Sequence, residues 1–105
     1  MVKIKEDNWK IIKNSGNVKI VDFYAEWCGP CKTLGKIFEE LEENSEGIDF
    51  FKADVEECLE AADEFEIKSV PTVIILKNGE VKEKLVGVQP ASKYESLLKF
   101  WKEND

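Results

Sequence analysis

The sequence predicts an α/β protein. We expect one domain over residues 1–105, with a central mixed β-sheet of about five strands flanked by about four helices. Strand-like and helix-like segments alternate three times from the start of the chain, which favours strands joined by helical crossovers. An Asn-Gly turn then joins two further strand-like runs into a hairpin before a last amphipathic helix. A chain of 105 residues can bury enough surface to fold as a single unit.

The first elements are short. Residues 2–5 predict a strand, and Trp9 with Ile12 predicts a short amphipathic helix that ends near residues 15–17. The run over residues 19–25 is apolar except at its ends and at Asp22, which is typical of a buried strand. A carboxyl group is therefore expected in an apolar setting.

The middle of the chain contains two predicted helices separated by a strand. A helix is expected over residues 30–44, closed by Gly47, because four apolar residues repeat at helical spacing: Leu34, Ile37, Phe38 and Leu41. Residues 48–53 predict a strand. Residues 57–65 predict a helix that carries three apolar residues on one side: Leu59, Ala62 and Phe65.

The last third begins with a strongly strand-forming run at residues 72–76. The turn at residues 77–80 contains Asn-Gly at its centre and leads into a strand at residues 81–86. A C-terminal helix starts near Pro90, with an apolar stripe that we assign to the core: Tyr94, Leu97, Leu98 and Trp101.

The charge balance excludes several classes of function. All fifteen basic residues are lysines, against 22 acidic residues, so the net charge is −7. Nucleic acids and anionic membranes both require a basic patch, so we expect neither as a partner. No apolar run approaches the roughly 18 residues of a membrane helix, and the N-terminal residues do not resemble a secretion signal. We therefore expect a cytoplasmic protein and a monomer.

The cysteine pair Cys28 and Cys31 lies where a predicted buried strand ends and a helix begins. Residues three apart in the first helical turn share a face, and a modest adjustment brings them to disulfide distance. Free N–H groups at the helix N-terminus stabilise a thiolate at Cys28, which is the predicted nucleophile. Cys31, one turn inside the helix and expected to be less exposed, is the predicted resolving thiol. Pro30 fits the first turn because it lacks an N–H.

Two other interpretations of the pair remain: a turn that merely contains two cysteines, and half of a zinc site. This spacing is common in zinc modules. However, only Cys58 remains as a third thiol and the chain contains no histidine, so we expect no metal. The missing histidine also excludes nucleophiles activated by imidazole.

The segment from Asp22 to Lys32 contains Trp-Cys-Gly-Pro-Cys at residues 27–31 and closely resembles the active-site signature of the thioredoxin family. Further matches stand in the family's order and spacing at residues 70–72, 77–80 and 86–87. The likeness covers nearly the whole chain, and it implies the thioredoxin fold for the sheet and helices expected above.

The resemblance assigns proton transfer to Asp22, because the matching aspartate of the family moves a proton to and from the resolving cysteine. The apolar strand around Asp22 independently predicts burial and a raised pKa for this carboxyl. Lys52 matches a lysine that accompanies that aspartate in many members, and we expect a supporting role for it. Cys58 resembles an extra cysteine of animal members, and we expect an inert, partly buried thiol.

The resemblance also implies a substrate-binding surface around the nucleophile. Pro71 matches a proline that the family holds in the cis form, and the backbone of the preceding residue, Val70, pairs with the substrate chain. Trp27 and Gly87 match residues of the apolar contact surface, and Gly29 and Pro30 lie between the cysteines. From sequence alone, Trp27 fits a core position equally well, and Pro71 fits the start of an edge strand.

The implied function is general protein-disulfide reduction by dithiol-disulfide exchange through Cys28 and Cys31. Partners are then disulfide-containing target proteins and a thioredoxin reductase, and no bound cofactor is implied. Two alternatives remain: a disulfide oxidase or isomerase on the same fold, and a binding subunit whose redox activity is incidental. One departure from many members is Lys36, preceded by Gly35, where a proline usually bends the active-site helix.

Overall fold

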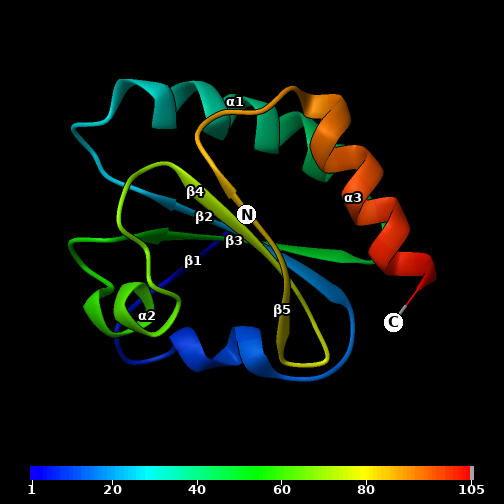
Figure 1. Ribbon diagram of the computed structural model, residues 1–105, viewed down its shortest axis with the longest axis horizontal. Helices are drawn as coiled ribbons and strands as arrows, with labels where there is room; N and C mark the ends of the chain where they lie inside the picture. Colours follow the sequence, from blue (N-terminus) through cyan, green and yellow to red (C-terminus); the bar gives the residue numbers. More distant parts are fainter. Residues whose placement is uncertain (105) are drawn as a thin grey trace.

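Five strands form one mixed sheet in the order β1-β3-β2-β4-β5 (Figure 1). The computed structural model describes residues 1–104. The strands are β1 (Val2–Ile4), β2 (Val18–Tyr24), β3 (Ile48–Asp54), β4 (Thr72–Lys77) and β5 (Glu80–Val86). β1, β3 and β2 are parallel, whereas β4 runs antiparallel to β2 and β5 antiparallel to β4. The predicted mixed sheet of about five strands is confirmed.

Helices cover both faces of this sheet (Figure 1). One face carries α1 (Gly29–Glu43) and α3 (Ala91–Glu103), and the other carries the 3₁₀ helix η1 (Trp9–Lys13) and α2 (Leu59–Glu64). α1 continues through Gly35 and Lys36 as one fifteen-residue helix. None of the helices within residues 1–104 is both long and apolar enough to cross a membrane.

Two apolar layers hold the helices to the sheet. Under α1 and α3, Ile20, Phe38 and Tyr94 have no exposed surface, and the ring of Phe38 makes an edge contact with that of Tyr94 at 5.4 Å. Under η1 and α2, Ile12 and Phe23 are equally buried. Complete burial of a side chain of this size contributes about 1.5–3 kcal/mol. The strand β2 supplies both layers, because successive side chains point to opposite faces.

The predicted hairpin is confirmed. Asn78 and Gly79 both have positive φ, at 54° and 80°, which is the backbone that a two-residue hairpin turn requires. The turn also packs closely on η1, since a Cβ on Gly79 would lie 2.9 Å from the Lys13 carbonyl oxygen.

The predicted apolar side of the α2 helix is wrong at Leu59, whereas Phe65, at its C-terminal end, packs against the core as expected. Leu59 is 64% exposed, while Cys58 and Ala61 are completely buried. The helix begins at Leu59, two residues later than expected, and the carboxylate of Glu6 accepts hydrogen bonds from the N–H groups of Leu59 and Glu60. Glu6, from a distant segment, therefore caps a helix whose buried side carries Cys58 and Ala61.

Candidate active site

The cysteine pair sits at the junction between β2 and α1. β2 ends at Tyr24, and the N–H of Cys28 donates a hydrogen bond to the Ala25 carbonyl at 3.1 Å, which turns the chain. Cys28 is the N-cap residue of α1, and a proline follows in the first turn. Proline is favoured there because its missing N–H would have no partner inside the helix.

Cys28 and Cys31 are joined by a disulfide, with their Cα atoms 5.3 Å apart. The predicted ability of the pair to close is therefore confirmed. The N–H of Cys31 also donates a hydrogen bond to Cys28 Sγ at 3.2 Å, so a helix N-terminal donor faces this sulfur. The expectation that Cys31 is less exposed is wrong for this oxidised form: Cys28 is 4% exposed and Cys31 5%. The two cysteines form a small buried cluster with Ala25, and Tyr24, Val55 and Val70 pack against this cluster.

Asp22 lies inside β2 and faces the α1 side of the sheet, as do its neighbours Val18 and Ile20. Its side chain is buried, and burial raises the pKa of the Asp22 carboxyl from 3.8 to about 7, against the opposing charge of Lys52. Lys52 is the register partner of Asp22 on β3. No donor among residues 1–104 forms a hydrogen bond with Asp22 Oδ1. The predicted burial and raised pKa are both confirmed.

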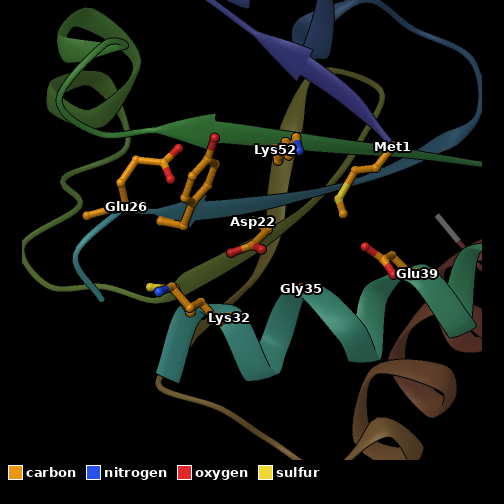
Figure 2. Close-up of a pocket in the computed structure, with 10 residues that line it drawn as sticks. Met1, Asp22, Glu26, Lys32, Gly35, Glu39 and Lys52 are labelled. Atoms are coloured by element: carbon orange, nitrogen blue, oxygen red, sulfur yellow. The ribbon is translucent and has the colours of Figure 1, made fainter. Parts of the chain in front are cut away.

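An open pocket of about 210 Å³ is lined by both Asp22 and Cys31, and Figure 2 shows Asp22 facing it from β2. We call it the Asp22 pocket. Three residues predicted for the chemistry, Asp22, Cys31 and Lys52, line it together. The other lining residues are Met1, Tyr24, Ala25, Glu26, Lys32, Gly35 and Glu39.

Sequence reasoning missed most of these lining residues. A signal was available for Gly35 and Glu39, which follow Cys31 by four and eight residues and therefore share its row along the helix. Met1 comes from the edge of the sheet, and no local pattern indicates its place at the pocket.

Of the predicted substrate-binding residues, Val70 packs against the cluster of the two cysteines. Trp27 is 71% exposed, which excludes the core position that the sequence allowed. The peptide bond between Val70 and Pro71 is cis, and the N–H of Gly87 donates a hydrogen bond to the Pro71 carbonyl at 2.8 Å. Gly29 and Pro30 are exposed at the start of α1.

The third cysteine lies elsewhere. Cys58 belongs to the apolar layer under η1 and α2, has no exposed surface, and burial raises the pKa of its thiol. Within residues 1–104, no group of three or more histidine, cysteine or acidic side chains is arranged to hold a metal ion.

Comparisons with known proteins agree with the geometry of a redox-active cysteine pair. The family model described as Thioredoxin matches residues 1–100. A thioredoxin of Staphylococcus haemolyticus is 42% identical over 99 residues, covering 93% of this chain and 94% of that protein. A thioredoxin of Mycoplasmoides gallisepticum is 46% identical over 80 residues, covering 76% of this chain and 80% of that protein.

Solved structures agree in fold. The structure of a mutant thioredoxin from Halobacterium salinarum superposes with a TM-score of 0.89 at 28% identity, covering 99% of this chain and 92% of the other. The predicted fold is thus confirmed at the level of the whole chain. The chain belongs to the thioredoxin family, and its Cys28–Cys31 pair is the redox-active centre of a protein-disulfide reductase.

Proposed function

We propose that Cys28 is the attacking thiolate, that Cys31 is the resolving thiol, and that Asp22 carries the proton between Cys31 and solvent. The observation that carries this proposal is the Asp22 pocket, which a buried carboxyl with a pKa of about 7 shares with Cys31. A pKa near the working pH suits a group that must both take and return a proton.

In the first step, Cys28 attacks one sulfur of a target disulfide. A mixed disulfide forms, and the other target sulfur leaves as a thiolate. Support for this assignment comes from the N–H of Cys31, which donates to Cys28 Sγ at 3.2 Å and would stabilise negative charge on that atom.

In the second step, Cys31 gives its proton to the Asp22 carboxylate and attacks Cys28 Sγ. The bond between Cys28 and the target breaks, the target leaves as a second thiolate, and the Cys28–Cys31 disulfide closes. Two electrons have passed to the target, and its two thiolates take protons from solvent. Lys52 acts as a positioning residue, because its charge keeps part of the Asp22 population ionised.

Target proteins dock on the exposed surface around the disulfide. Trp27 offers an exposed aromatic face, and Gly29 and Pro30 leave the start of α1 free of bulky side chains. Within residues 1–104, the backbone N–H and carbonyl of Val70 make no hydrogen bond, so they are free to pair with an extended target chain. Pro71 and Gly87 hold this segment in place through the bond between them.

The same proposal includes the oligomeric state, the cellular location and the electron donor of the protein. It acts as a single-domain monomer in the cytoplasm, carries no resident cofactor, and is reduced again by a thioredoxin reductase. The charge of −7 disfavours anionic partners and supports a soluble carrier.

Replacement of the resolving thiol tests the assignment of roles. In Cys31→Ser, the mixed disulfide forms but is not released, so target proteins should accumulate covalently on Cys28. Non-reducing electrophoresis followed by mass spectrometry detects these complexes. Cys28→Ser is the matched control and should trap nothing. Equal trapping by both variants, or trapping by Cys28→Ser alone, would contradict the assigned roles.

A further inference from the structure

A gap in one row of helical side chains opens the Asp22 pocket. Cys31, Gly35 and Glu39 are spaced four residues apart on α1, so they form one row along the helix, and all three line the pocket. Figure 2 shows Gly35 and Glu39 on the side of α1 that faces Asp22. The middle position has no side chain. A Cβ built on Gly35 would meet no atom within 4 Å, which shows open space beside the helix at this point.

The inner end of this space holds an unpartnered atom. Asp22 Oδ1 is buried and receives no hydrogen bond from residues 1–104. A buried polar atom of this kind normally finds a water partner, and a water needs about 10–15 Å³ of free volume. The Asp22 pocket provides about 210 Å³, so water has room to reach the carboxyl.

The charged and titratable groups that face Asp22 come from every neighbouring element. They are Lys52 from β3, Tyr94 from α3, Cys31, Lys32 and Glu39 from α1, Tyr24 at the end of β2, Glu26 just after it, and the N-terminal ammonium of Met1, which is paired with Glu42. The hydroxyl oxygen of Tyr94 accepts a hydrogen bond from the N–H of Gln89 at 3.0 Å. None of these groups donates a hydrogen bond to Asp22 Oδ1, so this oxygen is available to a water molecule.

We propose that Gly35 is a positioning residue that keeps an opening beside α1 through which water reaches Asp22 and exchanges its proton with solvent. The inference rests on the proposed proton role of Asp22. When Cys31 attacks the mixed disulfide, its proton moves to the Asp22 carboxylate. The Asp22 O–H bond then breaks, a water molecule in the opening takes the proton, and the carboxylate is restored for the next cycle.

A larger side chain at position 35 tests this proposal, because it fills the opening beside α1. Gly35→Leu places a branched side chain in the pocket and displaces water, which should raise the pKa of Asp22 by about one unit because the carboxylate loses solvation. Gly35→Ala should shift it less, in the same direction. Thr33→Leu is the matched control, since Thr33 is exposed on the same helix and does not line the pocket.

Two measurements compare these variants with the parent protein. A ¹³C NMR titration of the Asp22 carboxyl in the oxidised protein gives its pKa. Single-turnover kinetics give the rate at which the mixed disulfide is released, whose pH profile should move upward by the same amount in Gly35→Leu. At pH 7 the release rate should fall about fivefold, because the carboxylate fraction falls. Attack by Cys28 should keep its rate.

Asp22→Asn separates the two levels of the proposal. If Asp22→Asn releases the mixed disulfide at the parent rate, the proton role itself is wrong. If Asp22→Asn is slow but Gly35→Leu keeps the parent pKa and release profile, the opening at Gly35 is irrelevant and only this inference fails. In the double variant, Gly35→Leu should add no further loss. If Gly35→Leu does not fold, Gly35→Met takes its place with the same readouts, because its unbranched side chain adapts to irregular space.

Discussion

Asp22 on β2 is the register partner of Lys52 on β3, and both side chains line the pocket that reaches Cys31. The two groups act on the carboxyl in opposite directions. Burial raises the pKa of Asp22 to about 7, and the lysine charge lowers it. The availability of Asp22 as a base near neutral pH therefore depends on both effects.

Removal of the lysine charge should leave a smaller fraction of Asp22 ionised, and so able to accept a proton, at neutral pH. In Lys52→Met the pKa of Asp22 should rise by about one unit, because an opposite charge nearby no longer favours the carboxylate. A ¹³C NMR titration of the Asp22 carboxyl measures this shift. Lys36→Met, which removes an exposed lysine of α1 outside the pocket, should leave the titration unchanged. A lowered pKa in Lys52→Met would show that the lysine does not act through its charge.

The buried carboxyl should also make folding stability depend on pH. Between pH 3.8 and about 7 the folded protein keeps the Asp22 proton while the unfolded chain has lost it. The unfolded state then binds fewer protons, so the free energy of unfolding falls as pH rises through this range and levels off above it. Three units of pKa shift correspond to roughly 4 kcal/mol.

Asp22→Asn should remove this loss, because an amide does not ionise. The oxidised variant should exceed the parent in stability by up to roughly 4 kcal/mol at pH 8 and differ little at pH 4. Guanidinium unfolding at both pH values gives the comparison. A stability difference that is the same at pH 4 and pH 8 would mean that ionisation of Asp22 is not its cause.

Local pattern was sufficient to predict the cysteine pair and the buried carboxyl at the centre of this site. The lone carboxyl in the run at 19–25 predicted a buried, weakly acidic Asp22, because burial of that run was evident from its apolar neighbours. The spacing of Cys28 and Cys31 at a helix start predicted that they can pair, since three residues of one helical turn fix their separation. The positive φ values of the hairpin turn follow from Asn-Gly itself.

Contacts between distant segments decide the features that the sequence did not reveal. Glu6, more than fifty residues away, caps the start of α2, and the local spacing that placed Leu59 on the apolar side was wrong for that residue. Cys28 is as buried as Cys31, and the cluster that they form is packed by Val55 and Val70 from separate segments. Neither contact can be predicted from the local sequence, because the residues that make it are far apart in the chain.

The cap that Glu6 provides should protect Cys58. Glu6 Oε1 accepts from the Glu60 N–H at 2.7 Å and Oε2 from the Leu59 N–H at 3.1 Å, directly beside the buried thiol. Loss of a helix cap typically costs about 0.5–2 kcal/mol, so Glu6→Ala should let α2 open more often. In the oxidised protein, where Cys58 is the free thiol, Glu6→Ala should speed its modification by a thiol reagent several-fold.

Asp7→Ala is the matched control for that experiment, because it removes a neighbouring exposed carboxylate that makes no hydrogen bond with α2. Its Cys58 should react at the parent rate. Equal acceleration by both substitutions would assign the effect to charge near the thiol, and no acceleration by Glu6→Ala would show that the cap does not limit access.

The hairpin turn should be sensitive to a single methyl group. Gly79→Ala forces a Cβ to within 2.9 Å of the Lys13 carbonyl oxygen and also places alanine at a φ of 80°, a left-handed conformation that costs about 1–2 kcal/mol by itself. We expect a larger loss of unfolding free energy than that, measured in denaturant. Gly16→Ala is the control, because Gly16 also has positive φ but open space around it. Equal losses of unfolding free energy in the two variants would mean that the turn moves away from the Lys13 carbonyl without an energetic penalty.

Trp27 should matter for binding and hardly at all for folding. Its side chain is 71% exposed, so truncation to alanine removes little buried surface, and the unfolding free energy should change by no more than about 0.5 kcal/mol. An exposed aromatic next to Cys28 fits the role of a docking anchor, and loss of such an anchor typically costs more than about 1 kcal/mol of binding. Trp27→Ala should therefore raise KM for a protein disulfide at least about fivefold, while a small disulfide that makes no contact beyond Cys28 reacts at the parent rate.

Phe100→Ala is the control, because Phe100 is an exposed aromatic on α3, and it should leave the kinetics with both substrates unchanged. A loss of activity toward both substrates in Trp27→Ala would instead place Trp27 in the chemistry of the cysteine pair.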